Sequence, residues 1–202
     1  NIGPLRNDPR EGVLLKVQAG FPLYALKRWI ARHAPNHFFA PDPTDESASI
    51  GGMAACNASG ARGFVYGSVR RHIHAITAVL ADGSVTTLTR GRDRAHAYDF
   101  QILDTAGCVA VSGTLPRYDL PRVKNAAGYR VAPDMDLVDL FIGSDGTLGA
   151  IVELELRLLP KPSVCWGLMC FSESEAAILD LADLLRESAA NPSALEYLDG
   201  HS

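Results

Sequence analysis

Apolar residues recur along the chain with two periods, and each period predicts its own kind of element. From 151 to 159 apolar and charged residues alternate, and Pro160 ends the run, which predicts a strand with one buried face and one wet face. A further strand is expected at 13–17. The apolar runs 73–80 and 85–88 flank Asp82-Gly83, a dipeptide typical of a hairpin turn.

Helical spacing predicts a helix over 22–34, where Leu23, Leu26 and Ile30 share one face. A second helix is expected after Ser172, which forms a capping box with Glu175. Strands are expected on either side of that helix, and short helices within two other segments. The two strands are 164–171 and 195–198, and the short helices fall within 49–60 and 137–142.

These elements predict an α+β fold with a boundary near Lys161–Pro162–Ser163 and a second unit that starts near 163. Residues 91–122 are weakly patterned and predict an excursion from the core. The N-terminal residues 1–12 resemble neither a signal nor a transit peptide, and the missing initiator Met favours an excised piece of a longer protein.

Composition narrows the class of protein. The chain has 202 residues, 47% of them hydrophobic and 21% charged, with a net charge of −4, as expected of a folded domain without a nucleic-acid partner. Its apolar runs are too short for a transmembrane segment. The four cysteines form no metal-binding spacing and are expected to be reduced and mostly buried, which favours a cytoplasmic protein. They are Cys56, Cys108, Cys165 and Cys170.

Three segments are candidates for chemistry, and each also has a purely structural interpretation. The small-residue stretch 49–63 lets a ligand approach the backbone, so that N–H groups at a helix start bind an anion such as a pyrophosphate; alternatively it packs a helix tightly on a sheet. GSDGTLG at 143–149 is neither a P-loop nor the dinucleotide fingerprint, and its alternative is a simple turn. KNAAGY at 124–129 combines a cation, an amide and a phenol, which makes it a candidate for chemistry; its structural alternative is a surface turn. The histidines have no metal-ligand spacing. The sequence also lacks the Gly-x-Ser-x-Gly nucleophile elbow that would predict a hydrolase.

In order and spacing, these segments resemble the FAD-linked oxidase family, which has the flavin-binding fold of vanillyl-alcohol oxidase. The branch that oxidises D-lactate, glycolate or 2-hydroxyglutarate is most similar. The pieces that carry the resemblance span most of 13–162 and are VQAGFPLYAL at 17–26, FAPDPTDESASIGGMAACNASGARGFVYGSV at 39–69, VLADGSV at 79–85, KNAAGY at 124–129 and LFIGSDGTLGAIVELELRLLPKP at 140–162.

The resemblance implies a PCMH-type FAD-binding domain, with FAD between two subdomains and a separate substrate cap. Residues 1–162 would be part of the FAD-binding domain, mainly its second subdomain, and 163–202 the beginning of the cap. Asp145 stands where relatives often have Glu, which keeps the charge but shortens the reach. The implied cofactor-binding residues are Pro41, Asp42, Ser49, Ile50, Gly51, Gly52, Asn57, Ala58, Ser59, Gly60, Tyr66, Gly67, Asp145, Gly146, Gly149 and Ile151.

The resemblance also implies a function for the longer protein. It would transfer a hydride from C2 of a 2-hydroxy acid to the flavin, which then passes electrons to an acceptor that the sequence does not identify. This chain alone is expected to be inactive, because the upstream phosphate loop and most of the cap are absent from it, and its uncovered face favours self-association. Two alternatives stay open: a cofactor-free binding or assembly module of the same fold, and an unrelated enzyme of a phosphate ligand.

Overall fold

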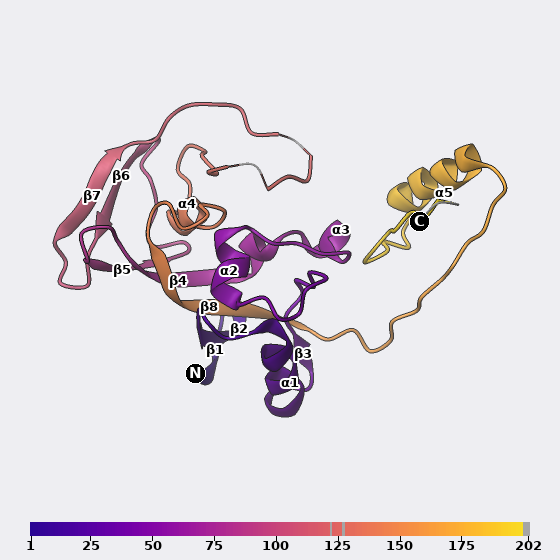
Figure 1. The fold of residues 1–202 in the computed structure, drawn as a ribbon, viewed down its shortest axis with the longest axis horizontal. Helices are drawn as coiled ribbons and strands as arrows, with labels where there is room; N and C mark the ends of the chain where they lie inside the picture. Colours follow the sequence, from indigo (N-terminus) through magenta and orange to yellow (C-terminus); the bar gives the residue numbers. More distant parts are fainter. Residues whose placement is uncertain (122, 127, 200–202) are drawn as a thin grey trace.

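The main sheet of the computed structural model is antiparallel and has β8 at its centre (Figure 1). The structure describes residues 1–121, 123–126 and 128–199. The strands follow the order β1-β2-β8-β4-β5, and the short β3 also pairs with β8. Their bounds are β1 Ile2–Asp8, β2 Gly12–Gln18, β3 His37–Phe38, β4 Ile73–Val79, β5 Val85–Thr89 and β8 Ala150–Pro160.

The alternation in β8 separates a buried face from a polar face, as the sequence predicts. Leu154 lies opposite Val17 of β2 and Ile76 of β4, and all three are buried. On the other face Glu153 pairs with Lys16 at 2.7 Å. This register fixes which side of the sheet carries the helices, because a shift by one residue would exchange the two faces.

The helices pack on the apolar face of the sheet. Leu23, Leu26 and Ile30 of α1 (Leu23–His33) are buried in the core, which confirms the stripe expected from the sequence. Helix α2 (Ile50–Ala55) adds Ile50 and Met53 to the same core. The 3₁₀ helix η1 (Val69–His72) and α4 (Val138–Phe141) also add buried residues to this core, whereas α3 (Gly63–Tyr66) has none.

The excursion 91–122 contains a hairpin that the sequence did not predict. Strands β6 (Asp99–Leu103) and β7 (Val109–Thr114) form a separate two-stranded sheet. It is attached to β5 by the Thr105 N–H, which donates to the Val85 carbonyl at 2.8 Å, and by the Thr86 hydroxyl, which donates to the Leu103 carbonyl at 2.7 Å. Residues 1–12 likewise hold an unpredicted strand, β1.

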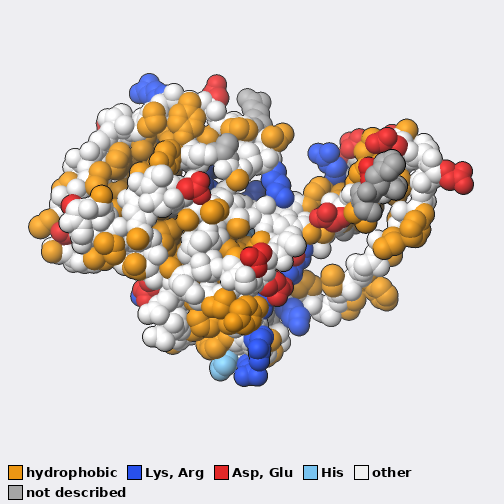
Figure 2. All heavy atoms as spheres, in the orientation of Figure 1, with side chains coloured by type: hydrophobic (Ala, Val, Ile, Leu, Met, Phe, Trp, Pro, Cys, Tyr) orange, Lys and Arg blue, Asp and Glu red, His pale blue; other side chains and the backbone are white. Residues whose placement is uncertain are grey.

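The C-terminal part differs from the sequence prediction. Helix α5 (Glu175–Glu187) forms, but its N-cap is Ser174, whose hydroxyl accepts from the Ala177 N–H, and not Ser172. The segments 164–171 and 195–198 are not strands, because within the described residues no neighbouring strand pairs with them. Trp166 is 84% exposed there, and the segment leaves the body of the molecule as an extended arm (Figures 1 and 2).

The cysteines also differ from expectation. Cys56, Cys108, Cys165 and Cys170 are free thiols, but all four are exposed rather than buried. Two of them lie on the extended arm, which has no packing partner among the described residues, and Cys108 lies in the turn between β6 and β7. Among the described residues no group of His, Cys, Asp and Glu has the arrangement of a metal site.

No helix in the described part of the chain is both long and apolar enough to cross a membrane.

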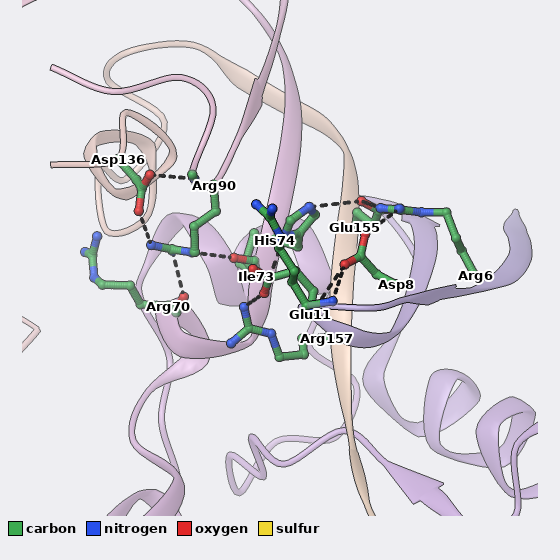
Figure 3. A network of polar contacts seen from close by, with 12 residues as sticks. Arg6, Asp8, Glu11, Arg70, Ile73, His74, Arg90, Asp136, Glu155 and Arg157 are labelled. Atoms are coloured by element: carbon green, nitrogen blue, oxygen red, sulfur yellow. Dashed lines mark hydrogen bonds and ion pairs between the residues drawn. The ribbon is translucent and has the colours of Figure 1, made fainter.

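Two buried histidines make the stability of this fold depend on pH. Burial lowers the pKa of His72 and of His74, although Glu155 opposes the shift at His74 (Figure 3). The unfolded chain therefore binds more protons than the folded chain below about pH 6.5. We expect the free energy of unfolding to fall as the pH drops below about 6.5 and towards the lowered pKa values of the folded state.

Urea denaturation between about pH 5 and pH 7.5 measures this dependence. The double variant His72→Gln and His74→Gln should show a flatter profile, because an amide does not titrate. The amide that replaces the imidazole of His72 also keeps a donor for the Tyr66 carbonyl, which His72 contacts at 3.0 Å. An equally steep decline in the double variant would assign the effect to other groups.

Candidate functional site

Two of the candidate segments meet in space through their backbones. The N–H of Gly143 donates to the carbonyl of Ala54 at 3.0 Å, and the N–H of Asp145 donates to the carbonyl of Ala55 at 2.9 Å. The loop 143–149 is thus docked on the C-terminal carbonyls of α2, where a helix leaves acceptors unsatisfied. Asp145 also accepts a hydrogen bond from the thiol of Cys56, which raises the pKa of that thiol.

The third candidate segment lies against the other two. The hydroxyl groups of Tyr129 and Thr147 are 2.5 Å apart, which joins 124–129 to the loop 143–149. Lys124 reaches in the other direction: its Nζ lies 3.4 Å from the place that a Cβ would take on Gly63, beside Ser59. Its ammonium group therefore adds a positive charge next to the segment 59–63. The three stretches that the sequence singled out therefore lie together and are the candidate site.

The start of α2 serves packing and not anion binding. The N–H of Ile50 donates to the Phe21 carbonyl at 2.9 Å, and the N–H of Gly51 donates to the Ala19 carbonyl at 2.7 Å. The next N–H, of Gly52, donates to the Ser49 hydroxyl at 3.1 Å. Because these donors have partners within the protein, the tight-packing interpretation of this part of 49–63 is the one that the geometry supports.

Backbone donors without a partner lie further along the chain. Among the described residues, no hydrogen bond is made by the N–H groups of Ser59, Gly60 and Ala61, or by those of Gly146 and Leu148. The first group follows α2, and the second belongs to the docked loop. Three consecutive open N–H groups beside Lys124, together with two more on the docked loop, are suited to the oxygens of a phosphate ligand. An anion site would therefore involve these loops and not the start of α2.

Two buried polar side chains lie where the segments meet and lack a hydrogen-bond partner among the described residues. They are Asn57, which is 8% exposed, and Ser144, which is 4% exposed. Asn57 adopts a left-handed backbone conformation, with φ of 49°, directly after α2. A buried polar atom without a partner costs about 1–3 kcal/mol, so such atoms indicate a place where a ligand supplies the missing partner.

A buried network of charges holds the docked loop from the other side. The guanidinium of Arg70 donates to the carbonyls of Asp139 and Ile142. Arg90 donates to the Asp139 carboxylate at 2.7 and 3.0 Å. It also donates to Asp136 at 3.3 Å (Figure 3). Burial lowers the pKa of Arg70, and the Asp139 carboxylate opposes that shift. Arg70 is one of two adjacent arginines in VRRH, which gives no sequence signal of this role, and Ser144 gives none either.

The residues predicted to bind the cofactor fall into two groups. The first group has clear partners within the protein: Asp42 forms an ion pair with Arg62 at 2.6 Å, and the Tyr66 ring lies edge-on to Phe38 at 5.5 Å. The second group offers open backbone or side-chain atoms at the meeting of the segments. The first group is Asp42, Ser49, Ile50, Gly51, Gly52, Ala58, Tyr66, Gly67, Asp145, Gly149 and Ile151, and the second is Asn57, Ser59, Gly60 and Gly146; Pro41 is buried.

Comparisons with known proteins indicate the family of this chain. The family model described as "FAD binding domain" matches residues 5–89. "D-lactate dehydrogenase" of Anaerostipes hadrus is 28% identical over 94% of this chain and 32% of its own length. "Glycolate oxidase subunit GlcD" of Bacillus subtilis is 32% identical over 80% of this chain and 27% of its own length. The chain belongs to the FAD-linked oxidase family.

The α+β fold is that of the PCMH-type FAD-binding domain of this family, and FAD is its cofactor. The solved structure titled "alkyldihydroxyacetonephosphate synthase in P1" matches 79% of this chain and 21% of that chain at 18% identity, with a TM-score of 0.49. This chain spans about a third or less of the length of the two curated relatives. The site fits FAD, because its open N–H groups and the unpartnered Asn57 and Ser144 suit an anionic, polar ligand.

The packing role of Gly51 makes a direct prediction. A Cβ at this position would lie 2.5 Å from the Ala19 Cβ and 3.1 Å from the Ala19 carbonyl oxygen, so α2 would have to move away from its neighbour. We expect Gly51→Ala to lower the free energy of unfolding by about 1–3 kcal/mol, the usual cost of overpacking. Urea denaturation measures the change.

Gly20→Ala is the matched control, because no atom lies within 4 Å of its added Cβ and its φ is not positive. It should leave the stability nearly unchanged. Wild-type stability in the Gly51→Ala protein would contradict the packing interpretation.

Proposed function

We propose that the natural protein containing this chain is a flavin-dependent oxidoreductase that oxidises a 2-hydroxy acid of the D-lactate or glycolate type. The observation that carries the proposal is the convergence of 57–61 and 143–149, with open backbone donors and two unpartnered buried side chains at their junction. The names of the relatives, a D-lactate dehydrogenase and a glycolate oxidase subunit, support the substrate class.

In this proposal the described residues hold the anionic part of FAD. The N–H groups of Ser59, Gly60 and Ala61 and those of Gly146 and Leu148 donate to phosphate oxygens, and Lys124 neutralises charge. Asn57 and Ser144 supply further polar contacts. Because most of these donors belong to the backbone, their effect depends on how the loops are held and less on side-chain identity.

When bound, FAD supplies the hydride acceptor for oxidation of the alcohol carbon of a hydroxy acid. The chain's own contribution is to bind and orient the cofactor. We assign no catalytic base among the described residues. Residues 1–162 are proposed as part of the FAD-binding domain and residues 163–202 as the beginning of the substrate cap, which would give the exposed apolar side chains of 164–171 a packing partner.

The test uses the natural protein as its gene encodes it. We expect a visible flavin absorption band that survives gel filtration, after reconstitution with FAD where necessary. Under anaerobic conditions D-lactate, glycolate or D-2-hydroxyglutarate should bleach this band, and L-lactate serves as a stereochemical control. A retained flavin that no hydroxy acid bleaches would refute the substrate class. A protein that never retains FAD would refute the flavoenzyme and favour a cofactor-free module.

Ser144→Ala separates cofactor binding from folding. The Ser144 hydroxyl is buried without a partner among the described residues, so its removal should leave the stability of the cofactor-free protein unchanged or higher. FAD affinity should fall severalfold, because the proposed contact is lost. Fluorescence titration with FAD and thermal unfolding of the cofactor-free protein give the two readouts.

Ser84→Ala is the control, since the Ser84 hydroxyl donates to Asp82 at 2.7 Å in the β4–β5 turn. This variant should lose some stability and keep wild-type FAD affinity. Wild-type FAD affinity in Ser144→Ala would remove Ser144 from the proposed site.

A further inference from the structure

Arg70 connects the two parts of the proposed cofactor site. It lies on η1, which is tied to the first part because the Val69 N–H donates to the Ala58 carbonyl at 2.8 Å. Its guanidinium donates to the carbonyls of Asp139 and Ile142, and Ile142 immediately precedes the docked loop 143–149. One side chain therefore links segments about seventy positions apart in the sequence.

Arg90 holds both the main chain of Arg70 and the residue that accepts from its guanidinium. It donates to the main-chain carbonyl of Arg70 at 3.1 Å (Figure 3). It also donates to the Asp139 carboxylate at 2.7 Å. The side chains of Arg70 and Asp139 are only 12% and 11% exposed. A planar guanidinium can donate along two directions at once, whereas a lysine ammonium is a point charge on a flexible stem. The two contacts use different nitrogens of Arg70, Nη1 and Nη2, so a lysine, which has a single nitrogen, should reproduce them less well.

The space around this contact is tight. Gly143 has φ of 87°, and a Cβ there would lie 3.2 Å from Arg70 Nη2 and 3.3 Å from the Cβ of Asn57. The docked loop is consequently enclosed by Arg70, by Asn57 and by the α2 carbonyls that accept from Gly143 and Asp145. Displacement of the guanidinium would release one of these three contacts.

We propose that Arg70 is a positioning residue for FAD: it fixes the loop 143–149 relative to 57–61, so that the open N–H groups of both converge on the same ligand. It acts through the main chain and has no proposed contact with the cofactor. This inference rests on the proposed function. A ligand held by two loops binds more tightly when the loops are already ordered, because less entropy is lost on binding.

A merely structural role makes a different prediction. If Arg70 only stabilised the fold, its substitution would lower FAD affinity in proportion to the stability lost. Substitution of any other arginine that pairs within the fold would then have the same effect. Arg157 provides that comparison, because it pairs with Glu11 on the opposite face of the sheet. Its side chain is 30% exposed, and it has no contact with the loops of the site among the described residues.

The experiment measures the dissociation constant of FAD by fluorescence titration of the natural protein and its variants, beside thermal unfolding without FAD. We expect Arg70→Ala to weaken FAD binding by about tenfold or more, which corresponds to about 1.4 kcal/mol. Added guanidinium should restore much of the affinity at concentrations far below the molar range that unfolds proteins, with sodium chloride at equal ionic strength as control. Arg70→Lys should restore less, and Arg157→Ala should bind FAD like the wild type.

Wild-type FAD affinity in Arg70→Ala would overturn the proposal. So would a loss of affinity that guanidinium does not reverse and that Arg157→Ala shares. If Arg70→Ala does not fold, Arg70→Lys carries the same comparison, and wild-type FAD affinity in Arg70→Lys would then overturn the role of the two carbonyl contacts.

Hydrogen exchange of the cofactor-free protein keeps this test apart from that of the proposed function. The amides of Gly143 and Asp145 in the cofactor-free protein should lose protection from hydrogen exchange in Arg70→Ala and keep it in Arg157→Ala. Unchanged protection in Arg70→Ala would refute the positioning role, whether or not the protein binds FAD. A wild-type protein that does not bind FAD, but whose loop loosens in Arg70→Ala, would refute the flavoenzyme proposal and also the role of Arg70 toward FAD, leaving only a role in holding the loop.

Discussion

The site depends on two backbone hydrogen bonds, from Gly143 and Asp145 to the last carbonyls of α2. A helix end has carbonyl groups that its own turns cannot satisfy, and here a distant loop supplies the donors. Helix α2 is fixed to the sheet by its other end, where its first N–H groups bond to the turn after β2. The position of the docked loop is therefore set by the sheet, with α2 as a short rigid connection between them.

This arrangement limits what α2 can do. Because its first donors are occupied, the helix start has no open N–H group at Ile50, Gly51 or Gly52 for a phosphate. The open donors of 59–61, Gly146 and Leu148 lie on segments without regular hydrogen bonding, which would be mobile if nothing held them. This need for support agrees with the proposal that the buried charges of Arg70, Arg90 and Asp139 serve to fix the loop, because burying them is costly and a buried ion pair is weak evidence for stability.

The sequence predicted the elements whose periodicity is local, and it failed where structure depends on a partner. The alternation in β8, the stripe of α1 and the Asp82-Gly83 turn are each visible within about ten residues, and all three are confirmed. The strand expected at 164–171 has the right composition, but a strand needs a neighbour to pair with. The hairpin β6–β7 is the converse case: it forms although its strands are mostly exposed and so lack strong alternation.

The same distinction explains what the sequence could say about the site. Small residues and glycines marked the three segments that meet. The sequence alone, however, does not distinguish a glycine that makes room for a neighbouring part of the protein from one that makes room for a cofactor. Gly51 admits Ala19, whereas Gly146 has φ of 75° and open space around it. Arg70 carries no sequence pattern, because its two acceptors are main-chain carbonyls of residues about seventy positions away. Motifs therefore identify the segments of such a site, and only the tertiary contacts show which residues hold those segments in place for a ligand.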